Sequence, residues 1–216
     1  MRSKHLMRRS APFVLTLVLA TAFAPGTAAL STTPLNTNLV KNPGAEANVG
    51  GNGYTGNGPS KWNAGGPWKV VKYGSPGFPT KGEANRIGGG KNFFSCGPGS
   101  DFGSLEQEVR LLGRNSQIDG ELLQFTFSVR IATYDAQQDK GSAQVFILDG
   151  DRFKLLEFEI GPVSATNGRF LKRTFTDVIP AGARYVLIYL FGDRVGGAAD
   201  YCDAYFDKVS FVIKKL

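Results

Sequence analysis

The feature that most constrains the fold is a regular alternation of apolar and polar residues in the second half of the chain. Apolar side chains occupy every second position of the clearest run, with polar side chains between them: Leu123, Phe125, Phe127, Val129 and Ile131. Successive side chains of a β-strand point to opposite faces of the sheet, so this period of two predicts a strand with one buried face.

A short strand running into a turn is predicted at 38–47. Further strands are predicted along most of the chain, at 68–73, 104–111, 143–148, 153–160, 169–179, 184–191 and 205–213. Asp149-Gly150 is a turn signal that joins two of these into a hairpin. The run at 184–191 is apolar on both faces, which predicts a central strand. No window of eleven or more residues carries a convincing helical stripe. The pattern therefore predicts an all-β sandwich in a single domain.

The first 29 residues have the layout of a secretory signal peptide. Basic residues precede an apolar run from Ala11 to Ala24, and small residues follow it up to Ala29. The run is shorter than the roughly 20 residues that span a bilayer. We predict a cleaved signal peptide at 1–29, a polar leader at 30–37 and one domain at 38–216. The protein is then secreted and has no membrane association after cleavage; a retained anchor is the alternative.

Cleavage changes what the composition allows. The signal peptide carries four of the 25 Lys and Arg residues, so the net charge falls from +7 to about +3 and no basic stripe remains to bind nucleic acid. The single histidine, His5, is removed with it. The remaining chain then has no His-dependent nucleophile system and no His-ligated metal site. Any metal should be a hard cation held by oxygen ligands.

Cys96 and Cys202 are the only cysteines of the chain. Exported proteins with an even number of cysteines usually pair them, so we predict one disulfide between these two residues. Two free thiols are the alternative.

One carboxylate in the last predicted strand points toward the core. Asp207 shares its face with Tyr205, Val209 and Phe211, and a buried carboxylate is costly unless it is paired or bound to a cation. Glu46 follows the first predicted strand, and a sandwich often brings its first and last strands together. We therefore expect Glu46, Asp207 and loop carbonyls to form a Ca²⁺ site. A salt bridge from Asp207 to a nearby Lys or Arg, or its exposure at the strand end, is the alternative.

Six aromatic residues lie in or beside the Gly-rich loops of the first half, and we predict them as ligand contacts: Trp62, Trp68, Tyr54, Tyr73, Phe93 and Phe94. Aromatic rings in such loops can stack on the C–H faces of sugars while polar side chains bind the hydroxyls. The alternative is that these rings plug the ends of the sandwich. Tyr134-Asp135 and Asp200-Tyr201 are further loop positions where a ligand can bind, but their spacing gives no support.

The sequence predicts no catalytic residue. A glycosidase needs two suitably separated carboxylates, and the chain has 18 acidic residues. Nothing in the pattern pairs them at neighbouring strand ends. Glu106 and Glu108 lie on the polar face of one predicted strand beside Arg110, which indicates a solvated, charge-balanced face.

Two motifs lie near the ends of the mature chain. The first is Asn42-Pro43-Gly44-Ala45-Glu46, followed by a Trp and by Leu-Glu-Gln at 105–107; the second is the run at 203–211. Together they resemble the galactose-binding-like β-sandwich, most of all its carbohydrate-binding-module members in secreted bacterial proteins. The resemblance covers residues 38–213 and implies a jelly-roll of two antiparallel sheets. It also implies a structural calcium held by Glu46 and Asp207. Lys208 stands where such families carry Asn and places a cation near that site.

These observations favour a secreted, non-catalytic module that binds carbohydrate, such as a cell-wall polysaccharide, or another extracellular surface. Two alternatives stay open. One is a structural or protein-interaction module without sugar binding, and the other is a small glycoside hydrolase that uses carboxylates.

Overall fold

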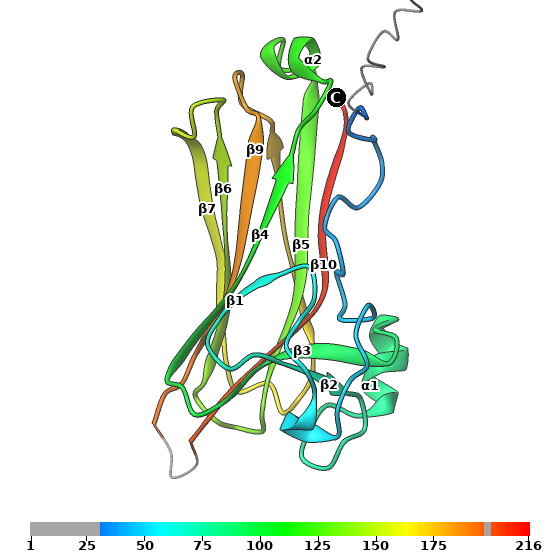
Figure 1. Ribbon diagram of the computed structural model, residues 1–216, viewed down its shortest axis with the longest axis vertical. Coiled ribbons are helices and arrows are strands. Elements are labelled where there is room, and N and C mark those ends of the chain that lie inside the picture. The colour runs from blue at the N-terminus through cyan, green and yellow to red at the C-terminus, as the bar shows by residue number, and fades with distance from the viewer. Residues whose placement is uncertain (1–30, 197–199) are drawn as a thin grey trace, which may run out of the picture.

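The computed structural model describes residues 31–196 and 200–216, so the signal peptide predicted at 1–29 lies outside the described residues. The chain forms two five-stranded sheets with the strand orders β1-β4-β9-β6-β7 and β2-β3-β10-β5-β8 (Figure 1). All strand pairs are antiparallel. The strands are β1 (Asn63–Gly65), β2 (Lys69–Lys72), β3 (Asn92–Pro98), β4 (Phe102–Arg110), β5 (Leu123–Thr133), β6 (Lys140–Leu148), β7 (Lys154–Val163), β8 (Leu171–Val178), β9 (Tyr185–Asp193) and β10 (Tyr201–Lys215). The predicted all-β sandwich of two antiparallel sheets is confirmed.

Alternating side chains form the core between the sheets. Along β5 the odd positions from Leu123 to Ile131 are buried and the even positions are partly exposed, as the sequence predicted. Phe125 stacks on Phe211 of β10 at 5.2 Å and on Phe158 of β7 at 5.7 Å, which joins the two sheets. The predicted hairpin is β6 and β7, and the predicted central strand is β9, which pairs with β4 and β6.

The beginning of the described chain runs along the last strand. Asn38 forms an isolated antiparallel bridge with Val212, and the backbone N–H of Asn36 donates to the carbonyl of Ile213 at 2.8 Å. Leu35 packs against the main core. The residues predicted as a polar leader are therefore docked on the sandwich. The short strand predicted at the start of 38–47 is reduced to this bridge, and the predicted turn is present after it.

The predicted disulfide is present between Cys96 of β3 and Cys202 of β10, whose Cα atoms are 5.4 Å apart. Gly192 of β9 lies against it from the facing sheet, because a Cβ at this glycine would lie 2.5 Å from the sulfur of Cys96 and 2.7 Å from that of Cys202. The disulfide therefore lies between the sheets, in a space that only a glycine leaves open.

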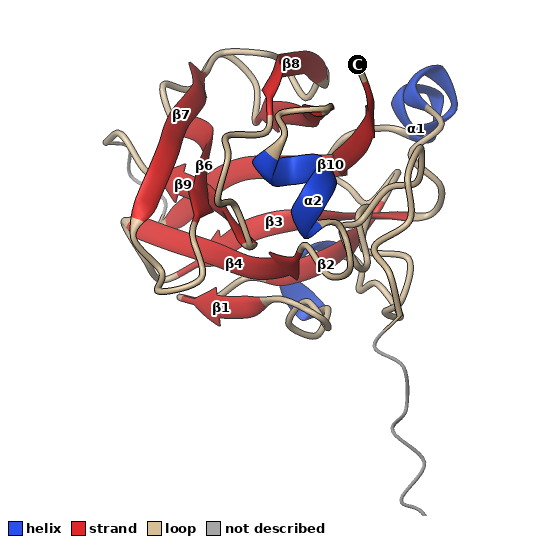
Figure 2. Ribbon diagram, turned by 90° about the horizontal axis from the view of Figure 1, so that it is seen from above, coloured by secondary structure: helices blue, strands red, loops and turns tan. Residues whose placement is uncertain are grey.

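Two short helices and a 3-10 turn, η1 (Gly53–Thr55), were not predicted. Helix α1 (Lys81–Ile87) begins after Thr80, whose hydroxyl accepts a hydrogen bond from the N–H of Glu83 at 3.1 Å, and ends at Gly88 in the left-handed conformation. Only Ala84 and Ile87 of α1 are buried, and two apolar positions are too few to show a helical period in the sequence. Helix α2 (Asn115–Asp119) lies over the opposite end of the sandwich, as the view from above shows (Figure 2).

Helix α1 covers part of the outer face of the second sheet. A small second core lies beneath it, formed by Val71, Tyr73, Ala84, Ile87, Phe93, Ala132, Phe170 and Tyr205. Among the described residues, no helix is long and apolar enough to cross a membrane.

Candidate functional site

Five of the six aromatic residues predicted as ligand contacts are buried: Trp62, Trp68, Tyr73, Phe93 and Phe94, each at most 7% exposed. Phe93 and Phe94 point to opposite faces of β3, so Phe94 joins the main core and Phe93 lies under α1. A buried ring offers no face to a sugar. The expectation of ligand stacking by these five residues is therefore corrected, because the Gly-rich loops fold closely over them and use their rings as packing.

The two tryptophans show this packing role in detail. Trp62 contacts Phe94 edge-on at 5.9 Å, and its indole N–H donates to the carbonyl of Asn42 at 3.2 Å. Trp68 packs against Phe206 of β10 at 5.7 Å. Both residues belong to the main core between the sheets.

Tyr54 of η1 is the exception, because it is half-buried and lines a surface cavity of about 380 Å³. We call this cavity the tyrosine groove; it is lined by Tyr54, Gly77, Phe78, Tyr134, Gln137, Tyr201 and Asp203. Four chain segments supply these residues at one end of the sandwich, where β5 ends and β10 begins. The groove is thus a product of the tertiary fold.

The aromatic rings of the groove are arranged in a continuous wall. Tyr54 stacks on Tyr201 with ring centroids 5.1 Å apart and an interplanar angle of 14°, and it contacts Phe78 edge-on at 5.1 Å. Tyr134 is 38% exposed and Tyr201 is 43% exposed. These two rings therefore keep open surface that a ligand can contact.

Asp203 is the polar group at the base of the groove. The hydroxyl of Tyr205 donates to its Oδ1 at 3.0 Å, and the hydroxyl of Tyr54 donates to the same oxygen. Asp139, itself buried, accepts a hydrogen bond from the backbone N–H of Asp203 at 2.9 Å. Burial is the main cause that raises the pKa of Asp203, and the negative charge of Asp139 adds to it. Burial of Tyr54 and the negative charge of Asp203 raise the pKa of the Tyr54 hydroxyl, which therefore stays protonated and donates its hydrogen bond.

A second cavity of about 410 Å³ continues the groove toward α1. It shares Gly77, Phe78 and Tyr134 with the groove, and it adds polar side chains that include Glu83, Asp135, Asn167 and Arg169. Hydroxyl-rich ligands need this combination of apolar ring surface with donors and acceptors at the sides.

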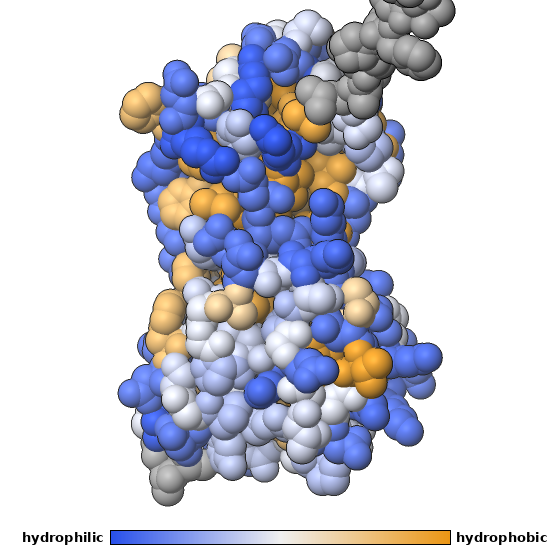
Figure 3. Space-filling model, in the orientation of Figure 1, coloured by the Kyte–Doolittle hydropathy of each residue, from blue (hydrophilic) through white to orange (hydrophobic). Residues whose placement is uncertain are grey.

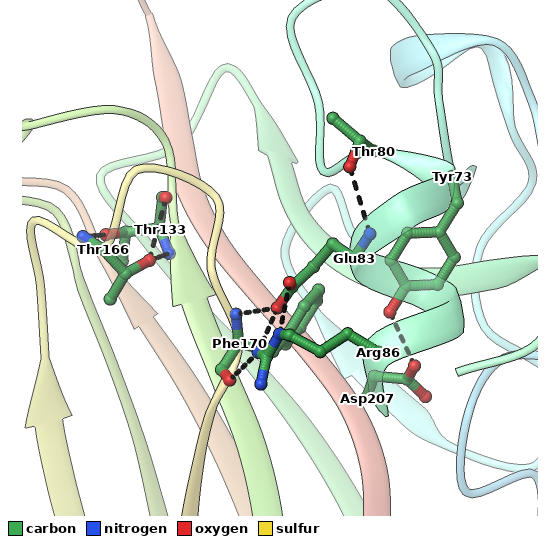
Figure 4. A network of polar contacts seen from close by, with 8 residues as sticks. All are labelled: Tyr73, Thr80, Glu83, Arg86, Thr133, Thr166, Phe170 and Asp207. Atoms are coloured by element: carbon green, nitrogen blue, oxygen red, sulfur yellow. Dashed lines mark hydrogen bonds and ion pairs between the residues drawn. The ribbon is translucent and has the colours of Figure 1, made fainter. Parts of the chain in front are cut away.

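Hydrogen bonds hold the segments around this extension in place. Glu83 of α1 accepts from the backbone N–H of Phe170 at 2.6 Å, and Arg86 donates to the carbonyl of Phe170 at 2.7 Å (Figure 4). The hydroxyl of Thr166 accepts from the N–H of Thr133 at 2.8 Å, directly before Tyr134. Tyr134 therefore lies on an anchored backbone.

A second aromatic surface lies on the outer face of the first sheet. We call it the β9 aromatic face; its residues are Phe102, Phe146, Tyr185, Tyr189 and Phe191. Tyr189 and Phe191 stack at 5.5 Å with an angle of 4°, Phe102 stacks on Phe191 at 5.5 Å, and Arg152 lies 4.5 Å from the centre of the Tyr185 ring. The rings of this face contact mainly one another and an arginine side chain.

One face of the molecule shows where hydrophobic residues gather on that side. On the face drawn in Figure 3, hydrophilic residues predominate and the hydrophobic patches concentrate in the upper half. The lower half, which contains β2, β3 and α1, is mostly pale or blue on this face.

Glu46 and Asp207, predicted as metal ligands, line one cavity of about 350 Å³ together with Gly44 and residues 88–90. Asp207 is fully buried and accepts hydrogen bonds from the hydroxyl of Tyr73 at 2.7 Å and from the N–H of Lys208 at 2.6 Å. Burial, above all, raises the pKa of Asp207 to about 7. Figure 4 shows the hydroxyl of Tyr73 pointing at this carboxylate. The fold thus brings the two predicted carboxylates to the same cavity.

The residues of this cavity fit a hard cation such as Ca²⁺. A Cβ at Gly44 or Gly89 would collide with the carboxylate of Asp207, and one at Gly90 would lie 2.7 Å from Oε1 of Glu46, so glycines keep the space beside both acids open. Within the described residues, no group of three or more His, Cys, Asp or Glu gathers to hold a metal, so carbonyl oxygens and water would complete the coordination. The ammonium of Lys208 donates to the carbonyl of Gly88 at 3.0 Å and thus lies at the rim.

Solved structures with a similar fold include two carbohydrate-binding modules that this chain matches over nearly their whole length. One is the module CBM61 in complex with β-1,4-galactotriose, with 18% identity, a TM-score of 0.50 and coverage of 83% of this chain and 99% of that chain. The other is a family 16 carbohydrate-binding module, with 14% identity, a TM-score of 0.51 and coverage of 81% and 99%. The chain also matches 21% of the enzymatically active domain of bacteriophage CBA120 tailspike protein 4, with 12% identity, a TM-score of 0.48 and 82% of this chain covered.

No family model matches the sequence, and no curated protein matches it either. At these identities the likeness concerns the fold. The chain therefore has the β-sandwich fold of carbohydrate-binding modules, and the resemblance found in the sequence is confirmed at that level.

Sequence reasoning named Tyr134 and Tyr201 only as loop positions where a ligand can bind, and it did not single out Phe78, Gln137 or Asp203 as ligand contacts. In the sequence, Tyr134 was marked by its place at the end of the clearest strand and Tyr201 by its place beside Cys202; in the structure Tyr134 directly follows β5 and Tyr201 begins β10. Their convergence depends on the pairing of β10 with β5 and β3, which no local pattern reveals.

Proposed function

We propose that this protein is a secreted, non-catalytic carbohydrate-binding module and that the tyrosine groove is its sugar-binding site. The observation that carries the proposal is the wall of Tyr54, Phe78 and Tyr201, which leaves open ring surface above the buried acid Asp203. Sugar rings stack their C–H faces on aromatic side chains, and their hydroxyls bind groups such as Gln137.

The fold supports the same proposal, because the two modules with a matching sandwich are carbohydrate-binding modules. The predicted signal peptide supports secretion, and a cell-wall polysaccharide is then an accessible ligand. Neither nucleic acid nor a membrane is a proposed partner.

A glycan array followed by titration calorimetry tests the proposed site. We expect Tyr134→Ala and Tyr201→Ala each to weaken the binding of the best glycan by about five- to tenfold, because each loses a stacking contact worth roughly 1 kcal/mol. Tyr189→Ala, on the β9 aromatic face, is the matched control and should bind as the unmodified protein does.

The outcomes separate the alternatives. Loss of binding in Tyr189→Ala with full binding in Tyr201→Ala would move the sugar site to the β9 aromatic face. A blank array would favour a structural or protein-interaction module. Release of reducing sugar from a panel of polysaccharides would contradict the non-catalytic assignment.

We also propose a structural Ca²⁺ held by Glu46 and Asp207. Support comes from the carboxylate of Asp207, whose pKa is raised mainly by burial and further by the neighbouring negative charge of Glu46, and from the glycines that keep the adjacent space open. The bound ion would supply positive charge that joins the segment after residue 42 to β10.

A further inference from the structure

A cavity of about 620 Å³ lies on the other side of α1 from the extension of the tyrosine groove. We call it the lysine cavity. Three separate segments contribute its lysines: Lys72 ends β2, Lys81 begins α1 and Lys91 directly precedes β3. These elements lie side by side in the lower right of Figure 1.

The charge of this cavity is not neutralised from within the chain. In the part of the chain that the structure describes, the ion pairs involve Arg86, Arg152, Lys154, Arg184 and Arg194, so none of the three cavity lysines has a carboxylate oxygen within 4.0 Å. The one acid in the lining is Glu46, whose Oε1 accepts hydrogen bonds from the backbone N–H groups of Lys91 and Asn92, each at 2.8 Å. The lining therefore carries a net positive charge.

Neutral polar groups and apolar side chains complete the lining. Asn92 is buried and donates through Nδ2 to the carbonyl of Asn48 at 3.1 Å, and its Oδ1 accepts no hydrogen bond within the described residues. Asn85 of α1 adds a second side-chain amide, and Val49 at the rim is 81% exposed. Amide groups suit hydroxyls, and an exposed aliphatic side chain suits the C–H face of a sugar ring.

We infer that the lysine cavity binds an anionic sugar residue, with its carboxylate or phosphate among Lys72, Lys81 and Lys91 and its hydroxyls at Asn85 and Asn92. The sugar part of this inference rests on the proposed carbohydrate-binding function. The anionic part rests on the three lysines, which outnumber the one acid of the lining, Glu46, and form no ion pair within the described residues. The cavity is distinct from the tyrosine groove, so the two sites fail or succeed separately.

The test is titration calorimetry of the whole secreted protein at low ionic strength with three probes: an oligogalacturonate, a hexose 6-phosphate and a neutral β-1,4-galactan oligosaccharide. The variant Lys72→Gln/Lys81→Gln/Lys91→Gln removes the charge of the cavity. The matched control is Lys140→Gln/Lys172→Gln/Lys214→Gln, which removes the same charge from exposed positions elsewhere. We expect the cavity variant to bind the acidic probe about tenfold more weakly and the control to bind it as before.

Binding of oligogalacturonate identifies the anion as a carboxylate, and binding of the hexose phosphate identifies it as a phosphate; either supports the inference. Equal weakening in both triple variants would overturn it, because the attraction would then be a property of the net charge. Failure of the unmodified protein to bind either acidic probe would also overturn it. The variant Tyr201→Ala tells the two proposals apart. If it loses binding of the neutral glycan and binds the acidic probe as before, the tyrosine groove and the lysine cavity are separate sites, which supports both proposals.

Discussion

The hydroxyl of Tyr54 donates a hydrogen bond to the carboxylate of Asp203, a residue 149 positions further along the chain. This contact ties η1 to the first residues of β10 and sets the ring of Tyr54 against Tyr201. One hydrogen bond therefore joins the polar base of the tyrosine groove to its aromatic wall.

Tyr54→Phe removes this hydrogen bond and keeps the ring. We expect a loss of about 1–2 kcal/mol in the free energy of unfolding, because a mostly buried carboxylate loses one of its donors. Chemical denaturation measures the change. Tyr134→Phe is the control, since the Tyr134 hydroxyl makes no side-chain hydrogen bond within the described residues, and it should change stability by less than about 0.5 kcal/mol. Equal stability of both variants would contradict a role for the Tyr54 contact.

The raised pKa of Asp203 predicts a specific dependence of stability on pH. The ordinary pKa is 3.8, and burial raises it in the folded protein. Between the two values the folded state holds a proton that the unfolded state has released, so stability is highest below the ordinary value and falls as the pH rises through the folded-state pKa.

Comparison with Asp203→Asn isolates this contribution, because most other titrating groups are common to both proteins. We expect the stability of the unmodified protein relative to the variant to decrease from pH 3 to pH 7, measured by denaturant titration at each pH. A relative stability that increases over this range would show that the folded-state pKa of Asp203 is lowered.

The disulfide closes a loop between residues that are 106 positions apart in the sequence. Cys96→Ala/Cys202→Ala should lower the free energy of unfolding by about 2–5 kcal/mol, since the unfolded chain regains the freedom that the crosslink removes. Guanidinium unfolding measures the loss. Reducing agent should destabilise the unmodified protein and leave the double variant unchanged, and equal sensitivity of the two would contradict the prediction.

Calcium should stabilise the folded protein if Glu46 and Asp207 hold it. At a calcium concentration of about one hundred times the dissociation constant, the expected gain is roughly 2.7 kcal/mol, seen as a rise of several degrees in the melting temperature over the protein in chelator. Asp207→Asn should abolish this rise, and Asp193→Asn, at an exposed position on β9, should retain it. Identical melting of the unmodified protein in calcium and in chelator would reject the site, and calorimetric titration with calcium gives an independent check.

The period of two in residues 123–131 was sufficient to predict β5, because alternation along a strand is a local property. The same reasoning placed Asp207 on one buried face with Tyr205, Val209 and Phe211. Its burial is confirmed, but the shared face is wrong: Tyr205 packs in the small second core and the other two in the main core, because β10 has a register shift between Asp207 and Ser210. The pairing of Cys96 with Cys202 followed from their number and the export signal. Helix α1 escaped prediction, since its two buried residues give no visible period.

The aromatic residues show what only the tertiary structure decided. Trp62 and Tyr54 both lie in Gly-rich loops and are alike to sequence reasoning, but Trp62 is enclosed by the core and Tyr54 opens onto a groove. The difference depends on which segments pack against each ring, and those segments lie far apart in the sequence. Local alternation determined the strands and the class of fold, whereas long-range pairing determined which side chains meet at the surface.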